Sequence, residues 1–353
     1  MRNAFPLLPV TMVSLLALSL ATDASAQMRL LSDGPQIELR DLAARVVVTP
    51  EDRSDVDIRV RYGKAKVPTL MVSHRGDVTV LNGHLSSQPR IGNFTLAINF
   101  DNVTADGGEV YISGIGKVQV EDLPLVFIRV PNNAVVKDSA YTLGHVNPSK
   151  SLDIIMNGSG DWSIDPVSGP LNIINSGSGA IHVASAGDGI VDNMGAGDIR
   201  IESMRNLKLS MTGSGNFSAG RAMNTDVQNQ GSGDVDLRNV NAITAKLNGS
   251  GDLILGNVTS GLTLINNGSS DVSADRLVGP VSLNLAGSGD VNISGGQIPG
   301  FIMRGSGSGD VDFGGIAGTV NIDSNGSGDI NIMKATGAVI TKVNGSGEMH
   351  IGH

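Results

Sequence analysis

The chain has 353 residues, no cysteine and a formal net charge of −9. Without cysteine there can be neither a disulfide framework nor a lipid-modified N-terminal cysteine. The net charge lies on residues 151–353, which carry 19 acidic and 10 basic side chains, whereas residues 27–150 carry 14 of each. This acidic surface excludes nucleic acid and anionic lipid as expected partners, because both require a basic footprint.

The first 26 residues predict a secretory signal. Arg2 precedes an apolar run at Leu15–Ala21, and Ala24-Ser25-Ala26 supplies an A-x-A cleavage site. The run is too short to span a bilayer, and no later stretch reaches about 20 apolar residues. We therefore expect no membrane span, cleavage after Ala26, and export to the periplasm, the cell surface or the extracellular space.

Residues 27–147 predict short strands separated by turns such as Asp106-Gly107-Gly108. The expected strands are Ile37–Leu39, Val46–Val48, Val56–Arg61, Asp77–Leu81, Phe94–Phe100, Val110–Ile112, Val118–Val120 and Val126–Val130. Because a repeat array needs an end that stops its edge from pairing with another chain, we expect this β region to cap the array that follows.

Residues 148–353 contain eleven near-copies of the tetrapeptide Gly-Ser-Gly-Asp. They start at Gly158, Gly177, Gly195, Gly213, Gly231, Gly249, Gly268, Gly287, Gly307, Gly326 and Gly345. Steps of 18 to 20 residues indicate a solenoid in which each repeat is one coil. The fold class is therefore all-β, a parallel β-helix with a β cap, and the crossover preference favours a right-handed coil.

Apolar residues alternate on both sides of each motif. The first and third residues after the motif are apolar in all eleven coils, from Trp162 and Ile164 to Met349 and Ile351. A second alternating pair precedes the motif, as at Leu262 and Leu264. A weaker third apolar point lies between the strands, at Val167, Val240, Val258, Leu277 and Ile316. This period of two predicts strands with one buried face.

Two features of the corner have structural interpretations. The motif glycines are expected to supply a tight turn through positive φ. Asparagine recurs two residues before the motif, at Asn175, Asn193, Asn229 and Asn266. An inward amide must be paired, so we interpret these residues as a partial internal ladder of stacked side chains.

The recurrent Asn-Gly-Ser-Gly-Asp corner, at Asn157–Asp161, Asn248–Asp252 and Asn325–Asp329, resembles the head GIN domain. This bacterial family is described as an autotransporter adhesin head. The strand that ends at Pro50 and the Val130-Pro131 strand end also resemble the opening of its members, and the resemblance covers most of residues 37–350. It implies a role in adhesion.

The fourth motif position forms an acidic stripe in the last coils, with Asp234, Asp252, Asp271, Asp290, Asp310 and Asp329 followed by Glu348. One hypothesis is structural, in which each Asp accepts hydrogen bonds from the amides of its own corner. The other is a row of Ca²⁺ ions shared between coils, since Ca²⁺ prefers carboxylate and carbonyl oxygens. No other cofactor is expected.

The sequence leaves three classes of function open. The first is a non-catalytic, adhesin-like module that presents repeated faces to an envelope glycan or protein. The second is a periplasmic scaffold or assembly partner, with the neutral N-terminal region or the C-terminal end as the contact. A separate expectation is end-to-end pairing of two copies through the C-terminal coil. The third, a polysaccharide lyase or hydrolase, is disfavoured because coils of even length leave no insertion to build a cleft around paired carboxylates. We therefore expect no enzyme activity.

Overall fold

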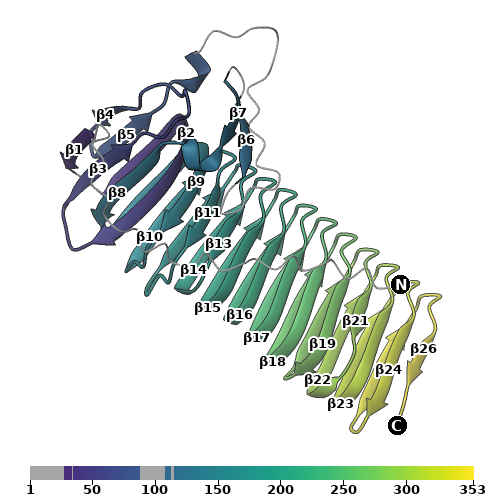
Figure 1. Cartoon of the computed structure of the whole chain (residues 1–353). Coiled ribbons are helices and arrows are strands. Elements are labelled where there is room, and N and C mark those ends of the chain that lie inside the picture. The colour runs from purple at the N-terminus through teal and green to yellow at the C-terminus, as the bar shows by residue number, and fades with distance from the viewer. Residues whose placement is uncertain (1–27, 34, 88–107, 113–114) are drawn as a thin grey trace.

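The computed structural model describes residues 28–33, 35–87, 108–112 and 115–353. It is 66% strand and 2% helix, and its stacked parallel coils form a β-solenoid of about 12 turns (Figure 1). This confirms the predicted fold class. The predicted signal sequence and the predicted strand Phe94–Phe100 lie outside the described residues.

Twenty-six strands and two short 3₁₀ helices make up the described chain. The strands before the first repeat are β1 (Met28–Asp33), β2 (Gln36–Glu51), β3 (Asp55–Arg61), β4 (Met71–Arg75), β5 (Val78–Asn82), β6 (Glu109–Ile112), β7 (Gly116–Gln119), β8 (Leu125–Pro131) and β9 (Asn133–Val146), with η1 (Leu85–Ser87) and η2 (Val120–Asp122). The strands of the repeats are β10 (Ser151–Met156), β11 (Asp161–Ile164), β12 (Leu171–Asn175), β13 (Ile181–Val183), β14 (Ala186–Asn193), β15 (Ile199–Met211), β16 (Phe217–Asn229), β17 (Val235–Leu247), β18 (Leu253–Asn266), β19 (Val272–Val278), β20 (Val281–Leu285), β21 (Val291–Ile293), β22 (Gly296–Gly305), β23 (Val311–Ser324), β24 (Ile330–Ala335), β25 (Val339–Val343) and β26 (Met349–Ile351).

Consecutive coils pair in parallel at the repeat spacing. Phe217 of β16 lies opposite Val235 of β17, which lies opposite Leu253 of β18, so equivalent residues stack along the axis. In β15 to β18 a single strand continues through the bend between the two predicted strands. The predicted coil of 18 to 20 residues is confirmed, and its handedness stays a prediction.

The inward positions form one continuous apolar core. Trp162, Phe217, Phe301 and Phe313 are fully buried, and the rings of Phe301 and Phe313 stack at 5.9 Å. The third apolar point is also buried at Val167, Val240, Val258 and Leu277. In one coil the prediction of this third apolar point was wrong. A register shift between Phe313 and Ile316 places the side chain of Ala317 in the core and leaves Ile316 half-buried.

The motif glycines were assigned the wrong role. None of them has a positive φ. Instead, a Cβ on Gly177 would collide with the carbonyl oxygen of Gly158, and one on Gly179 with that of Gly160. The same collision recurs along the array, so glycine is required because successive corners stack backbone against backbone.

The inward asparagines are buried as predicted, but they form a ladder only between Asn175 and Asn193, at 3.1 Å. Asn229 instead forms hydrogen bonds with the backbone of its own corner. Its Oδ1 accepts a hydrogen bond from Gly231 N at 3.0 Å, and its Nδ2 donates to Gly233 O at 2.9 Å. Asn266 makes the equivalent pair of bonds to its corner. These amides therefore satisfy backbone groups of their own corner, and Asn175, Asn193 and Asn229 also donate longer bonds of 3.3 to 3.5 Å to a glycine carbonyl of the next coil.

Parallel stacking continues into the predicted cap region. β9 pairs with β10 and β11, and β2 pairs with β9, β8 and β5. The stack then changes to antiparallel pairing, through β3 and β1 on one side and β4 on the other. These antiparallel strands cover the N-terminal end of the solenoid (Figure 1). The boundary between residues 147 and 148 stays a prediction.

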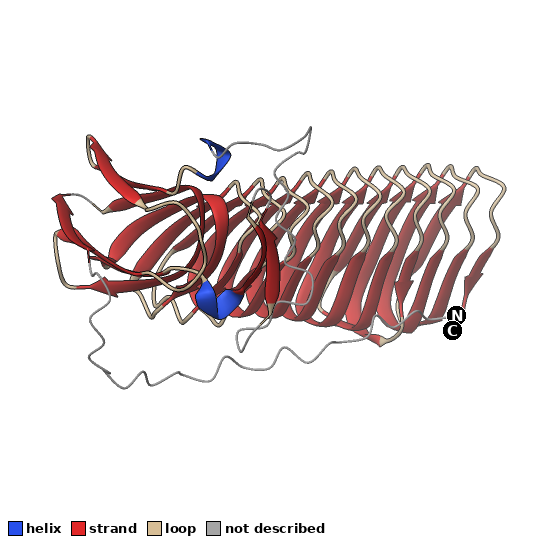
Figure 2. Ribbon diagram, turned by 45° about the horizontal axis from the view of Figure 1, so that its top comes forward, coloured by secondary structure: helices blue, strands red, loops and turns tan. Residues whose placement is uncertain are grey.

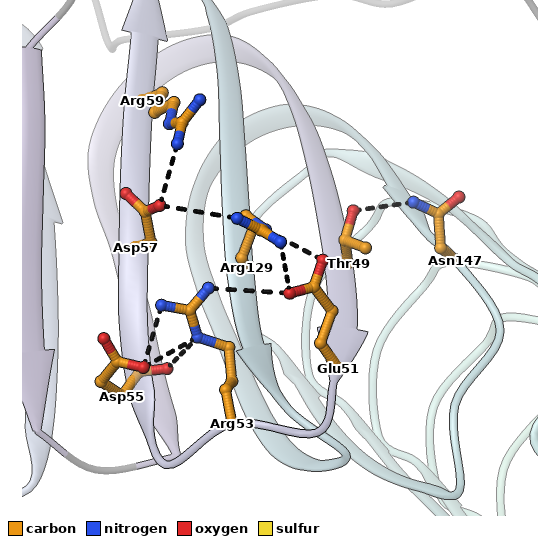
Figure 3. Close-up of polar contacts among 8 residues, drawn as sticks. All are labelled: Thr49, Glu51, Arg53, Asp55, Asp57, Arg59, Arg129 and Asn147. Carbon is orange, nitrogen blue, oxygen red and sulfur yellow. Dashed lines mark hydrogen bonds and ion pairs between the residues drawn. The ribbon is translucent and has the colours of Figure 1, made fainter.

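Six charged residues form a paired cluster where β2, β3 and β8 meet, and one of its pairs is Arg53 with Asp55 at 2.9 Å (Figure 3). Arg129 contacts Glu51 at 2.7 Å, and Glu51 also contacts Arg53 at 3.8 Å. The fully buried side chain of Asp57 lies 3.4 Å from Arg59 and 4.0 Å from Arg129. Because acids and bases alternate within it, we interpret this cluster as a structural part of the cap.

A buried carboxyl group lies inside the coil formed by β9. Asp138 Oδ1 accepts a hydrogen bond from Ala140 N at 3.0 Å, and its Oδ2 accepts bonds from Thr142 Oγ1 at 2.5 Å and Trp162 Nε1 at 2.9 Å. Burial raises the pKa of Asp138, and these three hydrogen bonds oppose the increase. Asp138 thus takes the place that Asn229 holds in its own coil, but two of its three partners are side chains, Thr142 and Trp162.

Candidate binding groove along the Gly-Ser-Gly corner

The Gly-Ser-Gly corners line up along one edge of the solenoid, where Figure 2 shows an even row of turns. Three segments of a shallow groove follow this edge. They have volumes of about 690, 720 and 540 Å³ and extend over residues 139–214, 212–269 and 286–346 of the array. We call the whole feature the corner groove. It exists because glycine stacking keeps the floor free of side chains.

Neutral hydrogen-bonding groups line the corner groove. The second motif position is Ser in ten coils and Ala196 in the remaining one. The position before the motif is Asn157, Ser176, Met194, Thr212, Gln230, Asn248, Asn267, Ala286, Ser306, Asn325 and Asn344. Coils stack ~4.8 Å apart, so hydroxyl and amide groups recur at that spacing along the groove.

The N-terminal end of the corner groove is formed by Asp41 and Tyr141. Asp41 has a positive φ of 49° and lies at the register shift of β2, where its carboxylate accepts hydrogen bonds from the amide and hydroxyl of Ser86. Burial and the charge of Asp41 raise the pKa of Tyr141. Sequence analysis missed both residues, because neither belongs to a repeat.

The acidic stripe is a ladder of hydrogen bonds beside the groove. Asp234 Oδ1 accepts from the amide of Asp252 at 2.9 Å, and Asp252 Oδ1 accepts from that of Asp271 at 2.9 Å. The pattern continues through Asp290, Asp310 and Asp329 to Glu348. The structure therefore brings all six predicted residues together. Their predicted partner was wrong, because the amide belongs to the next coil rather than to the residue's own corner.

This ladder explains why Asp or Asn recurs at the fourth motif position. Asn216 takes the same role, since its Oδ1 accepts from Asp234 N at 2.8 Å, and a neutral amide therefore suffices. Burial and the neighbouring charges of Asp234 and Asp271 raise the pKa of Asp252, while its bond from the Asp271 amide lowers it. Among the described residues, no group of three or more His, Asp or Glu is arranged to hold a metal ion. Calcium binding by the stripe stays a prediction.

A serine, a histidine and an aspartate meet on the strand face that follows the motif. His145 Nδ1 lies 2.8 Å from Ser163 Oγ, and His145 Nε2 lies 3.4 Å from Asp165. His145 and Asp165 are about one third exposed, at 31% and 37%, and none of the three lines the corner groove. On this open face the trio has no walls to exclude water from a reaction. We interpret it as a surface network between coils.

A family model described as "Putative auto-transporter adhesin, head GIN domain" matches residues 146–258 and 257–352. No curated protein matches the chain. In the described part of the chain, no helix has the length and apolar character needed to cross a membrane.

Three solved structures are similar to the chain at low identity. A "putative adhesin" from Bacteroides fragilis NCTC 9343 is 13% identical, with 87% of this chain and 96% of that chain covered and a TM-score of 0.25. A "putative lipid binding protein" from Parabacteroides distasonis ATCC 8503 is 15% identical, with 92% and 96% covered and a TM-score of 0.20. A "putative cell adhesion protein" from Clostridium sporogenes ATCC 15579 is 11% identical, with 65% and 99% covered and a TM-score of 0.20.

Proposed function

Since the chain belongs to the auto-transporter adhesin head GIN domain family, we propose that it is an exported, non-catalytic binding protein whose corner groove holds a polymer of the cell envelope. The observation that carries this proposal is the repetition of neutral hydroxyl and amide groups over an unobstructed glycine floor. Eleven coils give a groove of roughly 50 Å.

The groove favours an extended chain that bears hydroxyl or amide groups, such as a glycan. Each coil offers one or two weak hydrogen bonds, and binding several coils at once replaces single-site affinity with avidity. Because the Asp ladder runs beside the groove, a polyanion would be repelled unless cations bridge the two. We therefore propose a neutral or cation-bridged glycan rather than a polyanion alone.

The test is retention of the mature chain, residues 27–353, on insoluble envelope polysaccharide, in parallel with Ca²⁺ and with EDTA. Arginine placed at Ser214 and Ser250 would fill the groove with long side chains and should abolish retention. Ser273→Arg is the matched control, because Ser273 is exposed on the strand face that follows the motif. It adds one positive charge outside the groove, the same as Ser214→Arg or Ser250→Arg made singly, and should retain the polymer.

The outcomes separate the alternatives. Retention only with Ca²⁺ would assign the contact to cations on the Asp ladder. Equal retention by the groove variants and the wild type would place the site elsewhere. If no polysaccharide is retained in either buffer, glycan adhesion is wrong and the periplasmic scaffold becomes the better proposal.

A further inference from the structure

A separate cavity of about 330 Å³ lies at the bend within β16, β17 and β18, before the segments that lead into the corner groove. It lies where the coil length changes, since motif starts are 18 residues apart from Gly231 to Gly249 and 19 apart from Gly249 to Gly268. The extra residue produces a register shift between Val240 and Ala242, and Gly261 takes a φ of 131°. We call this cavity the Thr225 pocket.

Thr225 lines the pocket from a position that the adjacent coils fill with apolar side chains. It lies between Leu207 and Ile243 in the parallel register, and Ile243 lies opposite Leu262. Thr225 is only 5% exposed, and its Oγ1 has no hydrogen-bond partner. An unpaired buried hydroxyl destabilises a fold that would accept valine in the same space. Rotation about χ1 exchanges Oγ1 with Cγ2 and would present the hydroxyl to the pocket without loss of a hydrogen bond.

The rim supplies further groups that have no partner within the described structure. Asp226, Thr244 and Thr263 occupy equivalent outward positions on three successive coils, and all three line the pocket. Their side chains form no hydrogen bond or ion pair with the described residues. One carboxylate and two hydroxyls therefore face the same small volume, above a floor that includes Leu207, Ile243 and Leu262.

This combination defines the ligand by chemistry. No basic side chain lines the pocket, so an anion is not favoured, and one carboxylate alone is a poor cation site. A volume near the lower end of ligand pockets fits one ring. Carboxylate and hydroxyl groups pair with ligand hydroxyls, while the aliphatic floor contacts C–H groups. We propose that the Thr225 pocket binds a single neutral sugar ring, either free or as one unit of a glycan.

The experiment is saturation-transfer difference NMR of the mature chain with glucose, galactose, mannose and N-acetylglucosamine, each at millimolar concentration. Thr225→Val should raise the melting temperature, because it removes an unpaired hydroxyl, and should weaken sugar binding about tenfold, the effect of one hydrogen bond. Asp226→Asn should weaken binding without loss of fold. Asp153→Asn is the matched control, because Asp153 lies at the equivalent outward position outside the pocket.

Three results would overturn the proposal. The first is no saturation transfer to any of the four sugars. The second is unchanged binding in both Thr225→Val and Asp226→Asn, which would make Thr225 a merely unfavourable core residue. The third is an equal loss in Asp153→Asn, which would indicate a charge effect rather than a pocket. Loss of both sugar binding and polysaccharide retention in Thr225→Val would identify a unit of the glycan as the ligand, whereas loss of sugar binding with unchanged retention would identify a free sugar. The corner groove is tested by other variants, so either site can fail alone.

Discussion

Asn229 provides the most direct test of what stabilises a Gly-Ser-Gly corner. Its side chain is fully buried and pairs with two backbone groups of its own corner, Gly231 N at 3.0 Å and Gly233 O at 2.9 Å. It also donates a longer bond of 3.5 Å to Gly251 O of the next coil. In Asn229→Ala both groups lose this partner, in a corner that admits little water. An unsatisfied buried polar group costs about 1–3 kcal/mol, so we expect the two groups together to cost about 2–6 kcal/mol.

The array contains its own comparison. Leu247 lies opposite Asn229 in the next coil and is fully buried, so the position accommodates a leucine. Asn229→Leu leaves the same two backbone groups unpaired but regains apolar burial of about 2 kcal/mol. The leucine variant should therefore be more stable than the alanine variant by about that amount.

The assay is urea unfolding of the mature chain followed by circular dichroism, together with hydrogen exchange of the Gly231 amide. We expect both variants to lower the unfolding midpoint, with alanine the lower, and to accelerate exchange at Gly231. Unchanged exchange at Gly231 would contradict the assigned hydrogen bond. A leucine variant less stable than the alanine variant would show that size, rather than pairing, governs the position.

Three further predictions concern the backbone, the ladder and the buried acid. Gly231→Ala should cost about 1–3 kcal/mol by overpacking against the preceding corner, whereas Ser232→Ala should change the urea midpoint little. Burial and like charges raise the pKa of Asp252, so at pH values above this pKa Asp252→Asn should raise the melting temperature while it keeps the bond to the Asp271 amide, and Asp252→Ala should lower it. A Ca²⁺-dependent rise in the melting temperature of the wild type that is lost in Asp252→Asn would support the calcium hypothesis. Burial raises the pKa of Asp138, so its carboxyl is tolerated best below its unfolded pKa of about 3.9, and stability is lost as pH rises through the folded pKa. Asp138→Asn should flatten this part of the profile of melting temperature against pH, and an unchanged slope would contradict the assignment.

The period of the sequence predicted the architecture because one apolar pattern is repeated eleven times. Pairs such as Leu262 and Leu264 alternate with outward polar residues, and both are buried. A strand pattern of this kind is local, so it can be read without knowledge of the stack. The acidic stripe was predicted for the same reason, since equal spacing places equivalent residues on one edge.

The errors arose where contacts run between coils. Positive φ is a property of a single turn. The motif glycines are instead required by a steric contact with a residue 18 to 20 positions earlier, as Gly177 is by the carbonyl oxygen of Gly158. The bond from the Asp271 amide to Asp252 also crosses between coils. The predicted burial of Ile316 was wrong because a bulge shifts the register by one residue, which exchanges inward and outward side chains.

The same distinction separates structural from functional residues on this surface. Glycine and Asp recur at the corner because the stacked backbone needs space and an acceptor for each amide, which is sufficient reason for their repetition. The position before the motif varies among Asn, Ser, Thr, Gln, Met and Ala, although its side chains pair between coils where two asparagines are adjacent, as Asn267 does with Asn248 at 2.9 Å. Selectivity in the corner groove should therefore lie in this variable position, and exchanging Gln230 for Ala should alter polymer retention without changing the unfolding midpoint.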